Sequence, residues 1–250
     1  MPVVIMPEWN TLSIVAYTVF AMLCLSFGVL ESKGLLTLNY SKFRTSHGMS
    51  SRLGMFLLYF VPILAADIAT FWFVASFDLV KLIIIAAINI HFIKRCLEVL
   101  FLHKYSGPIN IATVIQIAAA YSLAAFLLAY LNQWSIDRID GLFLLGMVLF
   151  AVGQVSNLYH HKLLADLRTD DNSYKIPTGG LFEFVTAPHY LMELSAWLGV
   201  ALMSRHLAAY MIFVWTCSYL LARALRTHAW YHEKFADYPD DRRVIVPFIL

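Results

Sequence analysis

The residues most able to do chemistry gather around one turn-rich segment, Tyr174 to Tyr190, which reads YKIPTGGLFEFVTAPHY. A diglycine and two prolines mark it as a loop, and it leads into an apolar helix that carries Glu193. An ionisable side chain in such apolar company is costly and usually faces a bundle interior or a wet cavity. Glu193 is therefore interpreted either as a ligand-binding residue or as the structural partner of a nearby arginine.

Three further groups of polar residues recur at helical spacing. They are Asn157, His161 and Arg168; His91, Lys94, Arg95 and Glu98; and Arg223, Thr227, Tyr231 and Lys234. If these groups converge at one membrane face, their cations form a pocket suited to a phosphorylated ligand reached from the cytosol. The alternatives are the general excess of cations on the cytosolic side of membrane proteins and, for Lys94 with Glu98, an ordinary ion pair along one helix.

Several other kinds of site are excluded by the sequence. There is no GxGxxG motif with alternating strands and helices, no P-loop and no GxSxG elbow. The nine histidines do not form the set of clustered histidine boxes that a membrane di-iron oxygenase needs, and the three cysteines form no CxxC pair. We therefore expect no metal site and no disulfide framework. The net charge of only +2 gives no reason to expect a nucleic-acid partner.

The elements that must position these residues are membrane helices. Hydrophobic residues make up 60% of the chain and charged residues 14%, and the mean hydropathy is +0.70. A helix needs about 20 apolar residues to cross the hydrocarbon core. The sequence predicts one all-α integral membrane domain, residues 1–250, with seven spans at 11–30, 55–77, 79–93, 109–131, 139–164, 190–203 and 208–228. The third span is expected to continue as an amphipathic helix to His103.

The basic residues predict the orientation of these spans. If the N-terminus faces away from the cytosol, 15 of the 18 Lys and Arg residues lie on the cytosolic side, as the positive-inside rule requires. The C-terminus and the segment from Tyr174 to Tyr190 are then cytosolic. The expected partners are the lipid membrane and a lipophilic small molecule that enters from the bilayer, and the chain is expected to be a monomer. The expected membrane is the endoplasmic reticulum in a eukaryote or the inner membrane in a bacterium.

Several motifs carry a family resemblance. They are Tyr174-Lys-Ile-Pro-x-Gly-Gly-Leu-Phe-Glu-Phe-Val, the Glu193 that follows it, and Phe235-x-Asp-Tyr-Pro-x-x-Arg-Arg-x-x-x-Pro-Phe248. With these motifs, residues 150–250 resemble the C-terminal domain of the steroid 5α-reductase family. The helix from Asn157 to Arg168 resembles the Asn…Leu-Arg helix of that family. The segment from His91 to His103 is similar to the very-long-chain enoyl-CoA reductases of the same superfamily.

The resemblance implies an NADPH-dependent reductase of seven spans, with the cofactor between the helices and its phosphates toward the cytosol. It also makes the turn-rich segment a lid, in which Gly179 and Gly180 let the backbone approach the ligand. With the polar groups above, the residues expected to bind NADPH are Lys94, Arg95, Asn157, His161, Arg168, Tyr174, Lys175, Glu193, Arg223, His228 and Tyr231. Arg168 and Lys175 are the best candidates for the 2′-phosphate.

The reaction implied by the resemblance needs a hydrogen-bond donor for the carbonyl oxygen, where charge builds as hydride reaches the β carbon. Steroid enzymes have a Gln-Glu pair on the second helix and a Tyr on the third. The corresponding residues here are Leu58-Tyr59 and His91-Phe92. Tyr190 stands where enoyl-CoA and polyprenol reductases have a tyrosine. The candidate catalytic residues are therefore Tyr190, Tyr59 and His91, and an interfacial aromatic anchor is the alternative for Tyr190.

Alternative functions follow from the same residues. A 3-oxo-Δ4 steroid is the expected substrate, and a long-chain enoyl thioester is the alternative that Lys94, Arg95 and Tyr190 favour. A membrane isoprenylcysteine-type methyltransferase has a similar Pro-x-Tyr segment, but Glu233 stands alone where those enzymes carry an acidic pair. A non-catalytic lipid-binding relative would lack the polar groups, which are intact here.

Overall fold

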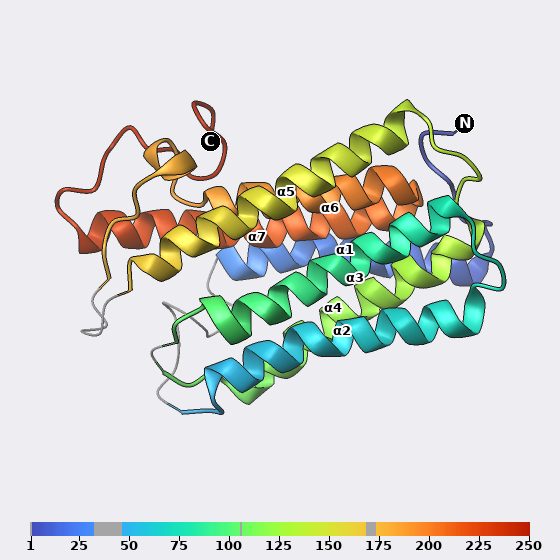
Figure 1. Cartoon of the computed structure of the whole chain (residues 1–250), viewed down its shortest axis with the longest axis horizontal. Helices are drawn as coiled ribbons and strands as arrows, with labels where there is room; N and C mark the ends of the chain where they lie inside the picture. The colour runs from blue at the N-terminus through green and yellow to red at the C-terminus, as the bar shows by residue number, and fades with distance from the viewer. Residues whose placement is uncertain (1, 33–46, 106, 169–173) are drawn as a thin grey trace.

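The computed structural model describes residues 2–32, 47–105, 107–168 and 174–250. In this part of the chain seven long helices run along the long axis of the molecule (Figure 1): α1 Thr11–Ser32, α2 Ser51–Phe73, α3 Leu79–Leu97, α4 Ile111–Leu131, α5 Gly141–Asp166, α6 Pro188–Ser204 and α7 Leu207–Lys234. Short pieces complete them: the π-helix η2 Glu98–Leu102 and the 3-10 helices η3 Asn132–Trp134 and η4 Gly180–Glu183. The prediction of an all-α fold is confirmed.

Every predicted span coincides with one of these helices, although several ends differ. The α2 helix ends at Phe73, four residues before the predicted end, because Val74 takes an extended conformation. The α7 helix runs on to Lys234, six residues beyond the predicted end, since no glycine or proline interrupts it before that point. By length and composition, α2, α4 with η3, α5 and α7 could cross a membrane, and Thr11–Cys24 is a shorter apolar stretch. The total of seven spans stays a prediction.

Small polar residues in the loops fix where three helices begin. Asp78 accepts a hydrogen bond from the amide of Lys81 at the start of α3. Asn110 does the same for α4, and Asp140 accepts from the amide of Phe143 in α5. Such caps satisfy amides that have no partner within the helix. These polar residues therefore fix the first residue of α3, α4 and α5.

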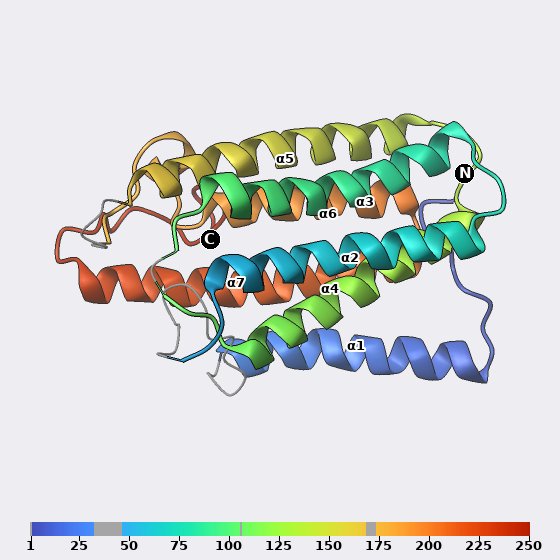
Figure 2. The same ribbon diagram turned by 60° about the horizontal axis from the view of Figure 1, so that its bottom comes forward.

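The helices α5 and α6 approach each other closely because glycines line their interface. A Cβ atom on Gly199 would lie 2.5 Å from the carbonyl oxygen of Gly146, and one on Gly153 would lie 2.6 Å from that of Met192. Small residues allow two membrane helices to pack backbone to backbone. The α2 helix packs against α3 and α4, and α1 lies along α7 at the edge of the bundle (Figure 2).

The lid segment, residues 174–187, crosses the end of the bundle between α5 and α6. Gly179 and Gly180 have φ angles of 88° and 56°, which side chains rarely tolerate. Next to them, the amide of Leu181 donates to Nε2 of His160 at 3.1 Å. His160 is buried near the end of α5. The lid is therefore fastened to α5 through one histidine.

The C-terminal tail, residues 235–250, holds the lid from its other side. Val185 and Arg243 form a parallel bridge, and the amide of Thr186 donates to the carbonyl of Arg243 at 2.8 Å. The buried Arg242 donates from Nη1 to the carbonyl oxygen of Pro177 at 2.8 Å. The two segments that carry the sequence motifs thus form one unit at the end of the bundle.

Candidate functional site

A cavity of about 200 Å³ lies among α2, α3, α4, α5, α6 and α7, near the end of the bundle where α2 begins and α5 ends. Its walls include two of the predicted catalytic residues, Tyr59 on α2 and Tyr190 on α6. Four residues predicted to bind the cofactor line it as well: Arg95, His161, Arg168 and Glu193. Helices far apart in the sequence therefore bring six of the predicted site residues to one cavity.

Beside the cavity, Glu98 is the centre of a buried cluster of charges, and only 2% of its surface is exposed. Its Oε2 accepts from the guanidinium of Arg95 and from Nδ1 of His161 at 3.0 Å, and its Oε1 lies 3.1 Å from Nζ of Lys94. Burial alone would raise the pKa of Glu98, but Arg95, His161 and Lys94 together hold this pKa well below its ordinary value. Glu98 is therefore an anion that balances Lys94 and Arg95, the two cations in the last turn of α3.

Arg95 connects this cluster to the cavity. Its Nη2 donates to the hydroxyl oxygen of Tyr59 at 2.7 Å, and the guanidinium lies 4.7 Å from the centre of the Tyr59 ring. The ring of Tyr59 also stacks on Tyr121 of α4, with centroids 5.9 Å apart. A guanidinium has no acceptor, so the Tyr59 oxygen must accept in this contact. The phenolic proton of Tyr59 is consequently directed to another group.

Lys94 connects the cluster to α5 and α6. Its ammonium donates to Oδ1 of Asn157. The amide nitrogen of Asn157 donates in turn to the backbone carbonyl of His189 at 2.7 Å, in the first turn of α6 and one residue before Tyr190. Lys94 and Asn157 were both expected to contact the cofactor. In this structure their hydrogen bonds link α3, α5 and α6, and a contact of either residue with the cofactor stays a prediction.

Glu193 lies on α6, one turn beyond Tyr190, and is 8% exposed at the cavity wall. Among the described residues no side chain donates a hydrogen bond to its carboxylate, and it forms no ion pair there. The positive charges of Arg95 and Lys94 act on it from a greater distance. A buried carboxylate that finds no donor among these residues is suited to a ligand that brings one.

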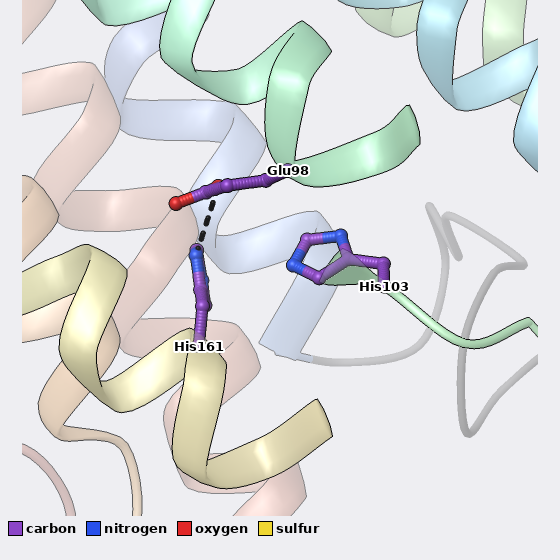
Figure 3. Close-up of side chains that lie close together, drawn as sticks. All are labelled: Glu98, His103 and His161. Atoms are coloured by element: carbon purple, nitrogen blue, oxygen red, sulfur yellow. Dashed lines mark hydrogen bonds and ion pairs between the residues drawn. The ribbon is translucent and has the colours of Figure 1, made fainter. Parts of the chain in front are cut away.

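His103 completes a group that could hold a metal ion. One ligand atom each from Glu98, His103 and His161 lies within 4.8 Å of the others (Figure 3). However, the guanidinium of Arg95 already contacts Glu98 and lies 2.8 Å from Nδ1 of His161, and its permanent positive charge opposes a cation there. Burial, and then the charge of Arg95, lower the pKa of His103 to about 2. The expectation that the protein has no metal site stays a prediction.

His91, the third candidate catalytic residue, is not among the residues that line the cavity. It is 5% exposed between α3, α5 and α6, one helical turn before Arg95. The side-chain amide of Gln154 donates to its Nδ1 at 2.9 Å, and its ring packs against Trp197 with centroids 4.8 Å apart. This geometry suits a polar contact that joins three helices better than it suits catalysis.

The other predicted cofactor residues gather near the lid. Tyr174 packs edge-on against Trp230 of α7, with ring centroids 5.0 Å apart. Two cations, Arg168 and Lys234, each lie 5.8 Å from the centre of the Tyr174 ring. The neighbouring Lys175 is exposed. This end of the molecule therefore presents aromatic rings and positive charge close to the cavity, which Arg168 also lines.

Three predicted residues on α7 lie against the lid or the tail, or inside the bundle. Nδ1 of His228 lies 2.6 Å from Oγ1 of Thr186, which also contacts the hydroxyl of Tyr238 at 2.8 Å. Tyr231 stacks on Tyr238 with centroids 5.1 Å apart. Arg223 is only 2% exposed, within α7. His228 and Tyr231 join α7 to the lid and the tail, and none of the three residues lines the cavity.

The sequence did not single out several residues of the cavity wall, namely His103, Lys104, Tyr105, Tyr121 and His189. Lys104 and Arg168 each bind the other's backbone, since Lys104 Nζ donates to the carbonyl of Arg168 at 3.0 Å and Arg168 Nη1 to that of Lys104 at 2.6 Å. His103 ends the segment that the sequence did single out. Lys104 comes after the helix has ended, since His103 is extended, so helical spacing gave no signal for it.

Comparisons with known proteins bear on what this cavity does. A family model described as 3-oxo-5-alpha-steroid 4-dehydrogenase matches residues 108–250, more than half of the chain. The chain belongs to the 3-oxo-5-alpha-steroid 4-dehydrogenase family. This membership confirms the resemblance, and it confirms an oxidoreductase acting on CH–CH groups.

Curated relatives of this steroid dehydrogenase family member come from animals, plants and an amoeba. It is 36% identical over 174 residues to 3-oxo-5-alpha-steroid 4-dehydrogenase 1 of Rattus norvegicus, which is 67% of each chain. It is 37% identical over 150 residues to Steroid 5-alpha-reductase DET2 of Solanum lycopersicum, 58% of each chain. It is 29% identical over 171 residues to Very-long-chain enoyl-CoA reductase of Dictyostelium discoideum, 65% of this chain and 56% of the relative.

Proposed function

We propose that this protein is an NADPH-dependent membrane reductase that transfers hydride to the C=C bond of an α,β-unsaturated carbonyl lipid, a 3-oxo-Δ4 steroid. Membership of the family supports the steroid, because the rat and tomato relatives are named for steroid substrates. The observation that carries the reaction is the cavity wall, where Tyr59 of α2 and Tyr190 of α6 lie beside Glu193, whose carboxylate accepts from no side chain among the described residues.

The residues present fit a nicotinamide dinucleotide. At the inner end, Glu193 offers an acceptor for an amide N–H, which a carboxamide supplies. Toward the lid, Arg168 and Lys175 offer charge-assisted contacts to phosphate, including the 2′-phosphate, and Tyr174 offers an aromatic face. A dinucleotide is too large for a cavity of about 200 Å³, so only one end of it would be enclosed. When bound, NADPH supplies the hydride.

The protein's own task is to hold the substrate carbonyl and to stabilise the charge that builds on its oxygen. Tyr190 and Tyr59 are the two predicted donors to this oxygen, and both line the cavity. Removing one such donor typically lowers turnover about 10²–10³-fold. The apolar remainder of a steroid would enter from the bilayer, between helices whose outer faces are apolar.

The test is NADPH oxidation by the purified protein with a 3-oxo-Δ4 steroid, in the wild type and in Tyr190→Phe. The substitution keeps the ring and removes one donor, so turnover should fall about 10²–10³-fold while NADPH still binds. Tyr130→Phe, a tyrosine outside the cavity wall, is the matched control. Full activity of Tyr190→Phe would leave Tyr190 as an aromatic anchor and remove it from catalysis.

A second candidate substrate is a long-chain enoyl-CoA. It is favoured by the cluster of Lys94, Arg95 and Glu98, which lies in the segment that is similar to enoyl-CoA reductases. The same assay with each substrate distinguishes the two candidates. Only with the substrate of this enzyme should NADPH be oxidised at a rate that falls in Tyr190→Phe. Binding of S-adenosylmethionine in place of NADPH would instead support the methyltransferase alternative.

We also propose that the protein is a monomer with seven spans in the endoplasmic reticulum membrane, or the inner membrane of a bacterium, with a cytosolic C-terminus. The partition of basic residues supports this orientation. A reporter fused after Leu250 should be accessible from the cytosol. Access only from the opposite side would overturn the topology and the cytosolic access of the cofactor together.

A further inference from the structure

We infer that Glu98, acting through Arg95, is a positioning residue for Tyr59, and that Tyr59 is a second donor to the substrate carbonyl beside Tyr190. This inference rests on the proposed reductase function and adds to it, because Glu98 was expected only to belong to a polar helix face or to pair with Lys94. It also changes the expected role of Arg95 from cofactor ligand to support for a phenol.

The contacts form one continuous path from α5 to the cavity. His161 of α5 donates to Oε2 of Glu98 at 3.0 Å, and the same oxygen accepts from Nη1 of Arg95. The other terminal nitrogen of Arg95 donates to the hydroxyl oxygen of Tyr59 at 2.7 Å. Glu98, Arg95 and His161 are all at least nine-tenths buried. Water therefore competes little for these hydrogen bonds.

The shape of the guanidinium explains how a carboxylate can orient a phenol that it does not touch. The five N–H groups of arginine form a rigid planar fork. Once Glu98 holds Nη1, the direction of Nη2 is fixed, and this nitrogen lies against Tyr59. The carboxylate also neutralises a guanidinium that is 7% exposed. Without Glu98 that cation would be held less firmly and would be costly to bury.

The contact with Arg95 alters what the Tyr59 hydroxyl can do. An oxygen that accepts from a cation in a dry environment makes its own O–H a stronger donor, because hydrogen bonds in series polarise one another. Stacking on Tyr121 holds the ring in place. The hydroxyl then donates to the carbonyl oxygen as hydride reaches the β carbon, and Arg95 supports any negative charge that the phenol takes up. Tyr59 and Tyr190 together would form a two-donor site for this oxygen.

The experiment is a set of double-mutant cycles, measured as kcat and KM with the enone that the wild type reduces, at saturating NADPH. Glu98→Gln is made alone, with Tyr59→Phe and with Tyr190→Phe. We expect it to lower kcat about 10- to 10²-fold alone and in the Tyr190→Phe background, and to have no further effect with Tyr59→Phe. KM for NADPH should change little. Asp166→Asn, which removes a carboxylate from an exposed ion pair with Lys162, is the control.

A purely structural role for Glu98 predicts a different pattern. The loss in kcat would then be the same with Tyr59→Phe as without it, and this additivity would overturn the inference while leaving the reductase function intact. If Glu98→Gln does not fold, Arg95→Lys takes its place, since it keeps the charge for Glu98 but removes the fork that reaches Tyr59. A wild type that reduces neither enone would overturn the proposed function, and this inference with it.

Discussion

At the scale of single residues, His103 is a histidine that the fold keeps neutral. Burial, and then the charge of Arg95, lower its pKa to about 2, whereas an unfolded histidine has a pKa of about 6.5. Between these values the unfolded chain binds a proton that the folded chain does not, so the free energy of unfolding rises with pH. The stability due to neutral His103 is complete above the unfolded pKa and is lost as pH falls below it.

The measurement is thermal unfolding in detergent across this window, for the wild type and for His103→Gln. We expect the midpoint of the wild type to fall as pH decreases from about 7 to about 5, and the midpoint of the variant to fall less. Glu98 contributes in the same direction only at lower pH, near the ordinary pKa of a glutamate, about 4.3. The same pH dependence in both proteins would show that His103 is not the group responsible.

The residues of the site could be predicted from the sequence only in part. Glu193, Tyr190 and Arg168 stand out because they are polar residues at fixed places beside apolar runs or motifs. The contact of Arg95 with Tyr59 could not be predicted, since it depends on how α2 and α3 are rotated toward each other. The spacing along one helix says nothing about that rotation.

At the scale of elements, the lid depends on the backbone of Gly180. Its φ of 56° is in the left-handed region, and a Cβ atom there would lie 2.8 Å from the Tyr159 ring and 3.0 Å from Nε2 of His160. Gly180→Ala should therefore displace the lid from α5 and raise the Kd for NADPH, with little change in the thermal midpoint of the bundle. The comparison is Gly141→Ala, because a Cβ atom there meets nothing within 4 Å. An unchanged Kd in Gly180→Ala would show that the lid does not contact the cofactor.

The elements themselves follow from the sequence more closely than the site does. Long apolar runs predict the helices, and caps such as Asn110 and Asp140 explain where two of them begin. The π-helix at Glu98 was not predicted, because the ordinary helical period continues through it in the sequence. The π-helix follows directly after α3 and begins at Glu98. Its wider turn changes the direction of the side chains at the end of α3, where Glu98 and Arg95 contact His161.

At the scale of the whole molecule, composition predicts the fold class, but not which helices pack together. The many apolar helices could bury their faces in several arrangements. The packing of α6 against α5 depends on Gly146, Gly153 and Gly199, because a Cβ atom at any of them would clash with the facing helix. The place of the site follows from that choice, since Asn157 of α5 then bonds the carbonyl of His189 in α6 and the ring of His161 packs against the ring of His189.

The length of α7 has a consequence for the membrane that surrounds the protein. Its 28 residues extend about 42 Å, whereas the hydrocarbon core is about 30 Å thick. One helix thus carries Leu220 in the cavity wall and, three turns later, Tyr231 against the tail that holds the lid. Hydrophobic mismatch would tilt this helix and displace the lid relative to the cavity. Turnover should pass through an optimum when it is measured in bilayers of short, medium and long acyl chains that share one headgroup. Equal turnover in all three bilayers would show that bilayer thickness does not affect the position of the lid.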